Sequence, residues 1–156
     1  MKIVPASAAD IAPVAALWHD GWHEAHAAIV PPELVALRVP AEFQDRTAAH
    51  IGQTHVGLID GELVGFVTVE DDEIYQLFVA PAARGTGAAR ALIVHGEGLI
   101  AKHHDRAWLA CTVGNSRAAH FYQKSGWTLA GEEDLLVETG DGPFPVRVWR
   151  YEKALK

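Results

Sequence analysis

A glycine-containing turn in the middle of the chain has the residues of an anion-binding site. Residues 76–92 read QLFVAPAARGTGAARAL, an apolar strand followed by a proline, a turn and the start of a helix. Gly85 and Gly87 allow the backbone of the turn to come close to a ligand. The first N–H groups of the helix have no partner within it, and the helix dipole favours negative charge there. A phosphate or pyrophosphate group is therefore the expected ligand.

The spacing within this turn separates it from two familiar phosphate-binding motifs. It has no Gly-Lys-Ser or Gly-Lys-Thr ending, which excludes a P-loop. The helix lacks the third glycine of the dinucleotide fingerprint, and the turn lies in mid-chain rather than after a first strand. The pattern that remains is Arg84-x-x-Gly87-x-Ala89.

A second block, from Asn115 to Trp127, reads NSRAAHFYQKSGW. Together the two blocks resemble the GNAT superfamily of N-acetyltransferases. The turn resembles that family's acyl-CoA pyrophosphate loop, Gln/Arg-x-x-Gly-x-Gly/Ala. The second block resembles its Asn-x-x-Ala-x-x-Phe-Tyr-x-x-x-Gly-Phe pattern, with Trp127 in place of the final Phe. The resemblance covers roughly residues 54–130.

The resemblance implies acetyl-CoA as co-substrate and no metal. The pyrophosphate would lie on the turn, and the pantetheine arm would lie like an extra strand beside residues 73–79. The main chain of Leu77 and Val79 would bind this arm, while their side chains remain free to pack in the core. The expected cofactor-binding residues are Leu77, Phe78, Val79, Arg84, Gly85, Thr86, Gly87, Ala88, Ala89 and Asn115.

The resemblance also implies direct acetyl transfer to a primary amine of a small molecule or peptide. A backbone N–H near Val79 would stabilise the oxyanion. Tyr122 would protonate the departing thiolate, because a phenol keeps its proton at neutral pH. Glu73 would act as the base through a water molecule, and His26 is the alternative base. Without the resemblance, Tyr122 would be read as a core aromatic residue and Glu73 as part of a solvated acidic turn.

The first helix supplies the expected acceptor-binding residues. Trp18 and Trp22 lie on its apolar stripe and His26 flanks that stripe. In the family this region lines the acceptor pocket, which implies that Trp22, His26 and Trp18 bind the amine. His19, His23 and His26 share one side of the helix and could bind zinc. A polar pocket rim is the favoured interpretation of these three histidines.

Bulk properties fit one domain over residues 1–156. No apolar run is long enough to span a membrane, and the N-terminus resembles a strand rather than a signal peptide. The net charge of −7 argues against nucleic-acid binding. Because CoA is also an anion, a local positive region at Arg84 and Arg90 would have to bind it. The single cysteine, Cys111, is expected to be a buried thiol in a reduced cytoplasmic setting.

Two other functions remain open at this point. The first is a non-catalytic acyl-CoA-binding or sensing domain of the same fold, because a cofactor motif alone does not show turnover. The second is a metal-binding protein that uses the helix histidines. The presence of both Asn115 and Tyr122 favours catalysis. A homodimer is possible, since dimers are common in the family.

These residues must be positioned by an α/β fold with a mixed sheet and helices on both faces. The strand–helix–strand order across residues 73–113 requires a parallel crossover, which fits the GNAT fold. The expected strands are 2–5, 55–59, 63–69, 73–79, 107–113, 127–130 and 146–152. The first expected helix runs from the Ser7–Asp10 cap to Pro31, with an inward stripe of Ile11, Val14, Trp18, Trp22, Ala25 and Ile29. Three further helices are expected at 32–37, 41–51 and 88–103. The last expected helix is capped by Asn115 or Ser116 and ends at Gly126.

Overall fold

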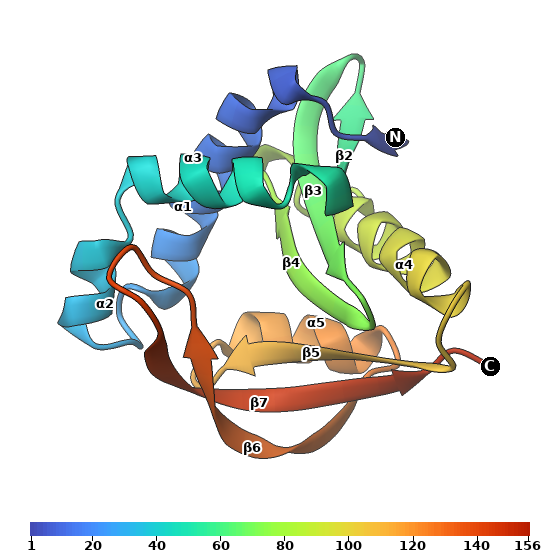
Figure 1. Ribbon diagram of the computed structural model, residues 1–156. Coiled ribbons are helices and arrows are strands. Elements are labelled where there is room, and N and C mark those ends of the chain that lie inside the picture. Colours follow the sequence, from blue (N-terminus) through green and yellow to red (C-terminus); the bar gives the residue numbers. More distant parts are fainter.

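The computed structural model describes residues 1–156 and contains one seven-stranded mixed sheet (Figure 1). The strand order is β1-β2-β3-β4-β5-β7-β6. All neighbouring strands are antiparallel except β4 and β5, which are parallel, as the strand–helix–strand order predicts. The strands are β1 Lys2–Pro5, β2 Thr54–Ile59, β3 Glu62–Glu70, β4 Glu73–Val79, β5 Arg106–Thr112, β6 Thr128–Val137 and β7 Phe144–Ala154. The helices are α1 Ile11–His26, α2 Pro32–Leu37, α3 Pro40–Ala49, α4 Ala88–Ala101 and α5 Ser116–Lys124, with short 3-10 turns at Ala8–Asp10, Ile51–Gln53 and Pro81–Ala83.

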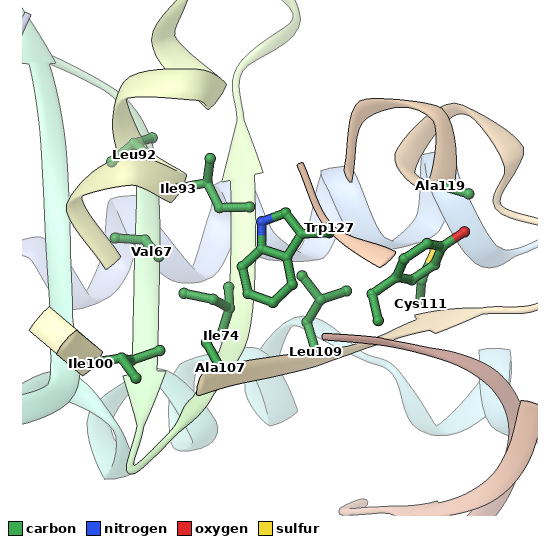
Figure 2. Packing of buried hydrophobic residues seen from close by; sticks show 11 residues of the cluster. Val67, Ile74, Leu92, Ile93, Ile100, Ala107, Leu109, Cys111, Ala119 and Trp127 are labelled. Atoms are coloured by element: carbon green, nitrogen blue, oxygen red, sulfur yellow. The ribbon is translucent and has the colours of Figure 1, made fainter. Parts of the chain in front are cut away.

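Two hydrophobic cores lie on the two faces of the sheet. The first lies under α4 and α5, and the second lies under α1, α2 and α3. Figure 2 shows Trp127 of the first core lying between Ile74 of β4 and Leu109 of β5. Its indole N–H donates to Glu97 Oε2 at 3.2 Å. Trp127 replaces the family's phenylalanine, and Glu97 thus accepts the hydrogen bond of the indole N–H that phenylalanine lacks.

The first helix begins as its sequence predicts and ends earlier. The Ser7 N–H donates to the Asp10 side chain at 2.8 Å, which is one half of a capping box. Val14, Trp18 and Trp22 are buried, in agreement with the apolar stripe. The stripe does not reach Ile29, because α1 ends at His26 and the chain turns there, with the N–H of Ile29 donating to the His26 carbonyl.

Strand β6 is much longer than the expected 127–130. Its acidic residues Glu132 and Asp134 resemble a loop in sequence, but both pair with Arg147 on β7, at 2.9 and 3.4 Å. β6 is an edge strand with mostly exposed side chains, so a polar composition is compatible with it. The other expected elements differ from the observed ones by one or two residues at their ends. None of the helices combines the length and the apolar character needed to cross a membrane.

Candidate active site

The central feature of the sheet is the separation of β4 and β5. These strands share one residue pair, Glu73 with Trp108, and then diverge (Figure 1). The divergence opens a cavity of about 860 Å³ between them, lined by α1 and α3 on one side and by the turn before α4 and by α5 on the other. A cavity of this size accommodates a cofactor arm together with a small acceptor.

A bulge in β4 determines which side chains face this cavity. Thr68 of β3 pairs with Gln76, but the next residue, Val69, pairs with Ile74, so Tyr75 is an extra residue on β4. Ile74 packs in the core under α4, whereas Tyr75 packs against the core under α1. Because side chains alternate along a strand, Glu73 lies on the same face as Tyr75. Both line the cavity.

The main chain of β4 beyond the bulge presents a free edge to the cavity. The N–H of Ala80 donates to Val64 of β3 at 2.8 Å, so the polar groups of this residue face β3. Because backbone groups alternate between the two edges of a strand, those of Val79 and Leu77 face the opposite edge, where no β5 pairing exists. An extended ligand could add to this edge as a strand does.

The glycine turn lies beside this free edge. Gly85 and Gly87 have φ values of +77° and +84°, a region that disfavours residues with a Cβ, and Gly87 caps α4. Ala88 and Ala89, the first two residues of α4, line the cavity. Thr86 does not line the cavity; its hydroxyl donates to the Ala83 carbonyl.

Arg84 is held by an ion pair that the sequence did not indicate. Its guanidinium donates to both carboxylate oxygens of Glu24 on α1, at 2.8 and 2.9 Å. Arg117 of α5 reaches the same carboxylate at 3.4 Å. The hydrogen bond from Arg84 and the two positive charges lower the pKa of Glu24. Glu24 thus connects α1, the glycine turn and α5 at the mouth of the cavity.

Asn115 precedes the first residue of α5, Tyr122 lies near the C-terminal end of the same helix, and both line the cavity. The Asn115 side chain accepts the N–H of Ala118 at 3.4 Å, so Asn115 rather than Ser116 caps the helix. Burial raises the pKa of Tyr122, so its phenol keeps its proton over the physiological range. Nearby, burial also raises the pKa of the Cys111 thiol to about 12, which makes it a poor nucleophile.

Glu73 has the electrostatic environment of a general base. Burial, followed by the negative charges of Asp72 and Glu70, raises the pKa of Glu73 to about 7. A carboxylate with this pKa exchanges protons near neutral pH. Glu73 lies where β4 and β5 join, and the free edge and the glycine turn lie farther along the same cavity.

His26 is a weaker candidate for the base. Its Nδ1–H donates to the Trp22 carbonyl at 3.0 Å, which leaves Nε2 as the free nitrogen. Burial lowers the pKa of His26 to about 4, so its imidazole is neutral at pH 7 and is only a weak proton acceptor. His26 and Trp22 both line the cavity, with ring centroids 5.2 Å apart.

Trp18 lies apart from the cavity, contrary to its expected role in acceptor binding. Its side chain is 2% exposed and packs on Phe43 and Phe66. The guanidinium of Arg46 lies 4.4 Å from the centroid of its ring. Arg46, rather than Trp18, is on the cavity wall.

A cluster of charged residues lies at the part of the cavity next to α3 and the end of β6. Glu42 of α3 pairs with both Arg38 and Arg46. Glu138, after β6, accepts from Arg46 at 3.4 Å and from Tyr75 at 2.5 Å. Burial would raise the pKa of Glu138, but hydrogen bonds from Tyr75 and His50 and the charge of Arg46 outweigh it and lower the pKa to about 2. The i, i+4 spacing of Arg38, Glu42 and Arg46 was a visible signal for part of this cluster.

The three histidines of α1 hydrogen-bond to different groups. His19 contacts Asp20 at 2.9 Å, and the Nε2–H of His23 donates to the Arg38 carbonyl at 2.7 Å. His26 donates to its own helix, as described above. Elsewhere, the ring nitrogens of His50 lie 2.6 Å from a Glu70 oxygen and 3.0 Å from a Glu138 oxygen, which adds a polar bridge between β3 and the segment after β6.

Known proteins are similar to this chain in sequence and in fold. The model of the acetyltransferase (GNAT) family matches residues 16–127. An uncharacterized N-acetyltransferase of Mycobacterium tuberculosis is 31% identical over 116 residues, which cover 65% of this chain and 72% of that protein. The 5-NmdU N-acetyltransferase of Pseudomonas phage PaMx11 is 32% identical over 96 residues, which cover 58% of this chain and 67% of that protein. The PaiA N-acetyltransferase of Thermoplasma acidophilum, solved in complex with coenzyme A, is 17% identical with a TM-score of 0.76, and the match covers 98% of both chains.

Proposed function

This chain belongs to the acetyltransferase (GNAT) family and is an acetyltransferase, and we propose that it moves an acetyl group from acetyl-CoA to a primary amine of a small molecule or peptide. The observation that carries the proposal is the single cavity that joins the glycine turn, the free edge of β4 and Glu73. The turn suits a pyrophosphate and the free edge suits an extended amide-containing arm. We also propose that residues 1–156 form one such domain.

Residues of this chain can carry each part of the transfer. Glu73 takes a proton from the ammonium group through water, and the neutral amine forms a C–N bond to the thioester carbon. A backbone N–H of β4 near Val79 stabilises the oxyanion that develops. The C–S bond then breaks, Tyr122 gives its proton to the departing thiolate, and the remaining extra proton on the amine nitrogen returns through water to the Tyr122 phenolate. Direct attack is favoured because the Cys111 thiol, with a pKa raised to about 12, is not suited to carry the acetyl group.

The alternative, an acyl-CoA-binding domain without turnover, makes a different prediction. A screen of acetyl-CoA with representative amine classes, read by the release of free CoA thiol, distinguishes the two. The amines should include amino acids, polyamines, peptides and 5-NmdU, which the phage relative's name contains. Thiol release above the rate without amine supports the enzyme. Binding of CoA by calorimetry with no release for any amine would favour the binding domain.

A further inference from the structure

The acceptor side of the cavity contains a buried arginine with unused hydrogen-bonding capacity. We propose that the acceptor amine also carries a carboxylate and that Arg38 binds this carboxylate. The inference rests on the proposed function, because it names the class of amine that the same cavity acetylates. Arg38 ends α2, lines the cavity and is 3% exposed.

The hydrogen bonds of the Arg38 side chain use one end of its guanidinium. Nη1 donates to the Glu42 carboxylate and, at 2.7 Å, to the Glu138 carbonyl. Nε is buried without a partner. A guanidinium presents Nε and Nη2 along one edge, and this edge matches the two oxygens of a carboxylate. A buried donor without a partner is costly, so a ligand that supplies an acceptor gains from it.

Arg38 also has fewer ionic partners than Arg46. Arg38 and Arg46 share one carboxylate, that of Glu42. Arg46 has further partners in Glu138, in the Tyr75 hydroxyl at 3.0 Å and in the Trp18 ring. Burial, followed by the charge of Arg46, lowers the pKa of Arg38, although the hydrogen bond and charge of Glu42 act in the opposite direction. An anion next to Arg38 would give this guanidinium an ionic partner that it does not share with Arg46.

The walls near Arg38 favour a flat anion with an apolar body. The guanidinium carbon lies 5.5 Å from the centroid of the Trp22 ring. His26, beside Trp22, is neutral because burial lowers its pKa to about 4. Glu73, with Glu70 next to it, provides the negative charge that suits the ammonium group. Arg38 and Glu73 thus line one cavity with opposite charges, which suits the two ends of an amino acid or another aminocarboxylic acid, whereas a polyamine would place a cation near Arg38.

The first test compares matched acceptors. Wild-type enzyme should acetylate the acid of at least one pair at least about tenfold better in kcat/KM than its uncharged counterpart, as expected for a charged hydrogen bond. The pairs are L-phenylalanine with L-phenylalaninamide, L-methionine with L-methioninamide, and 5-aminopentanoate with pentylamine. Amidation lowers the pKa of the neighbouring amine and thus favours the amides, so a preference for the amino acids is evidence of a carboxylate site.

Two variants test whether Arg38 is responsible for a preference for the acid. Arg38→Gln should remove the preference for the acid, and Arg147→Gln, at an exposed ion pair on β7, should retain it. Turnover of the amines with no preference for any acid would overturn the carboxylate site and leave the acetyltransferase function in place. A preference that survives in Arg38→Gln would overturn the assignment to Arg38.

A binding measurement tests the site without turnover. Calorimetry with 3-phenylpropionate and 3-phenylpropionamide, in the presence of CoA to cover the glycine turn, should show at least about tenfold tighter binding of the acid. The difference should vanish in Arg38→Gln. Equal binding of acid and amide by the wild type would overturn the inference even if no amine were acetylated or Arg38→Gln failed to fold. Absence of acetylation alone would count against the proposed function.

Discussion

Glu73 of β4 lies opposite Trp108 of β5, and this is the one residue pair that joins the two parallel strands. The Trp108 N–H donates to the Asp72 carbonyl at 3.1 Å, and its indole N–H donates to the Asp72 side chain at 3.0 Å. The guanidinium of Arg150 lies 4.3 Å from the centroid of the Trp108 ring. Several contacts therefore hold β4 and β5 together at this pair. The cavity opens directly beside Glu73, the candidate general base.

Glu73→Gln should lower kcat by about 10²-fold, the lower end of the range for general acid–base catalysis. In the wild type the rate should rise with pH through about 7, because only the carboxylate form of Glu73 accepts a proton and its pKa is raised to about 7. The variant should lose this limb of the pH–rate profile. Steady-state kinetics between pH 5.5 and 9 measure both effects. An unchanged profile in the variant would assign the base to another group.

His26→Ala should raise KM for the amine and leave KM for acetyl-CoA unchanged, because His26 lines the cavity beside Trp22 on the acceptor side. The pH–rate limb near 7 should remain in this variant, because burial lowers the pKa of His26 to about 4. Kinetics with each substrate varied in turn provide the measurement. Loss of the limb in His26→Ala together with its retention in Glu73→Gln would reverse the two assignments.

Tyr122→Phe should lower kcat by about 10²-fold with little change in KM for acetyl-CoA, because it removes only the hydroxyl that we propose as the proton donor to the thiolate. The ring packs near Phe121 and Tyr151, with centroids 5.4 and 6.1 Å away, and phenylalanine retains these contacts. Thermal unfolding of the variant provides the control for packing. Turnover at the wild-type rate would show that Tyr122 serves only the core.

The sequence predicted those features that depend on residues close together in the chain. The turn at Gly85 and Gly87 and the cap at Asn115 depend on neighbouring residues, and the structure contains both. The parallel β4–β5 pair also follows from the order of elements, because connected parallel strands need a crossover helix. Trp127 could be placed at the end of the second motif, but its hydrogen bond to Glu97 depends on how α4 lies on the sheet.

The charged side of the cavity could not be predicted, because its members come together only in the fold. Arg46 and Glu138 are 92 residues apart. Trp18 was misplaced for a related reason. An apolar stripe shows that a helix face is buried, but Trp18 lies under Arg46 in the core while Trp22, one turn later, reaches the cavity. Periodicity alone does not separate these two environments.

Gly87→Val should weaken CoA binding at least about tenfold, because a branched side chain at φ +84° strains the turn and adds bulk at the residue that caps α4. No protein atom lies within 4 Å of the added Cβ, so strain and ligand contact, rather than a clash in the core, should cause the effect. Gly98→Val is the matched control, because that α4 position is also open but has an ordinary φ. Calorimetric titration of folded variants should show normal affinity for the control. Equal affinity in Gly87→Val would place the pyrophosphate elsewhere.

Glu24→Gln should strengthen CoA binding by about two- to fivefold at low salt. The Glu24 carboxylate occupies the Arg84 guanidinium at 2.8 and 2.9 Å, and a pyrophosphate on the glycine turn would have to compete with it. Removing one negative charge from the mouth of the cavity leaves Arg84 and Arg117 free for phosphate. The gain is expected to be small because exposed ion pairs contribute about 0–1 kcal/mol, and it should shrink as salt is added. Asp20→Asn, one turn earlier on α1, removes an equal charge and should change the affinity little. Weaker CoA binding in Glu24→Gln would show instead that the Glu24–Arg84 pair holds the turn in its binding conformation.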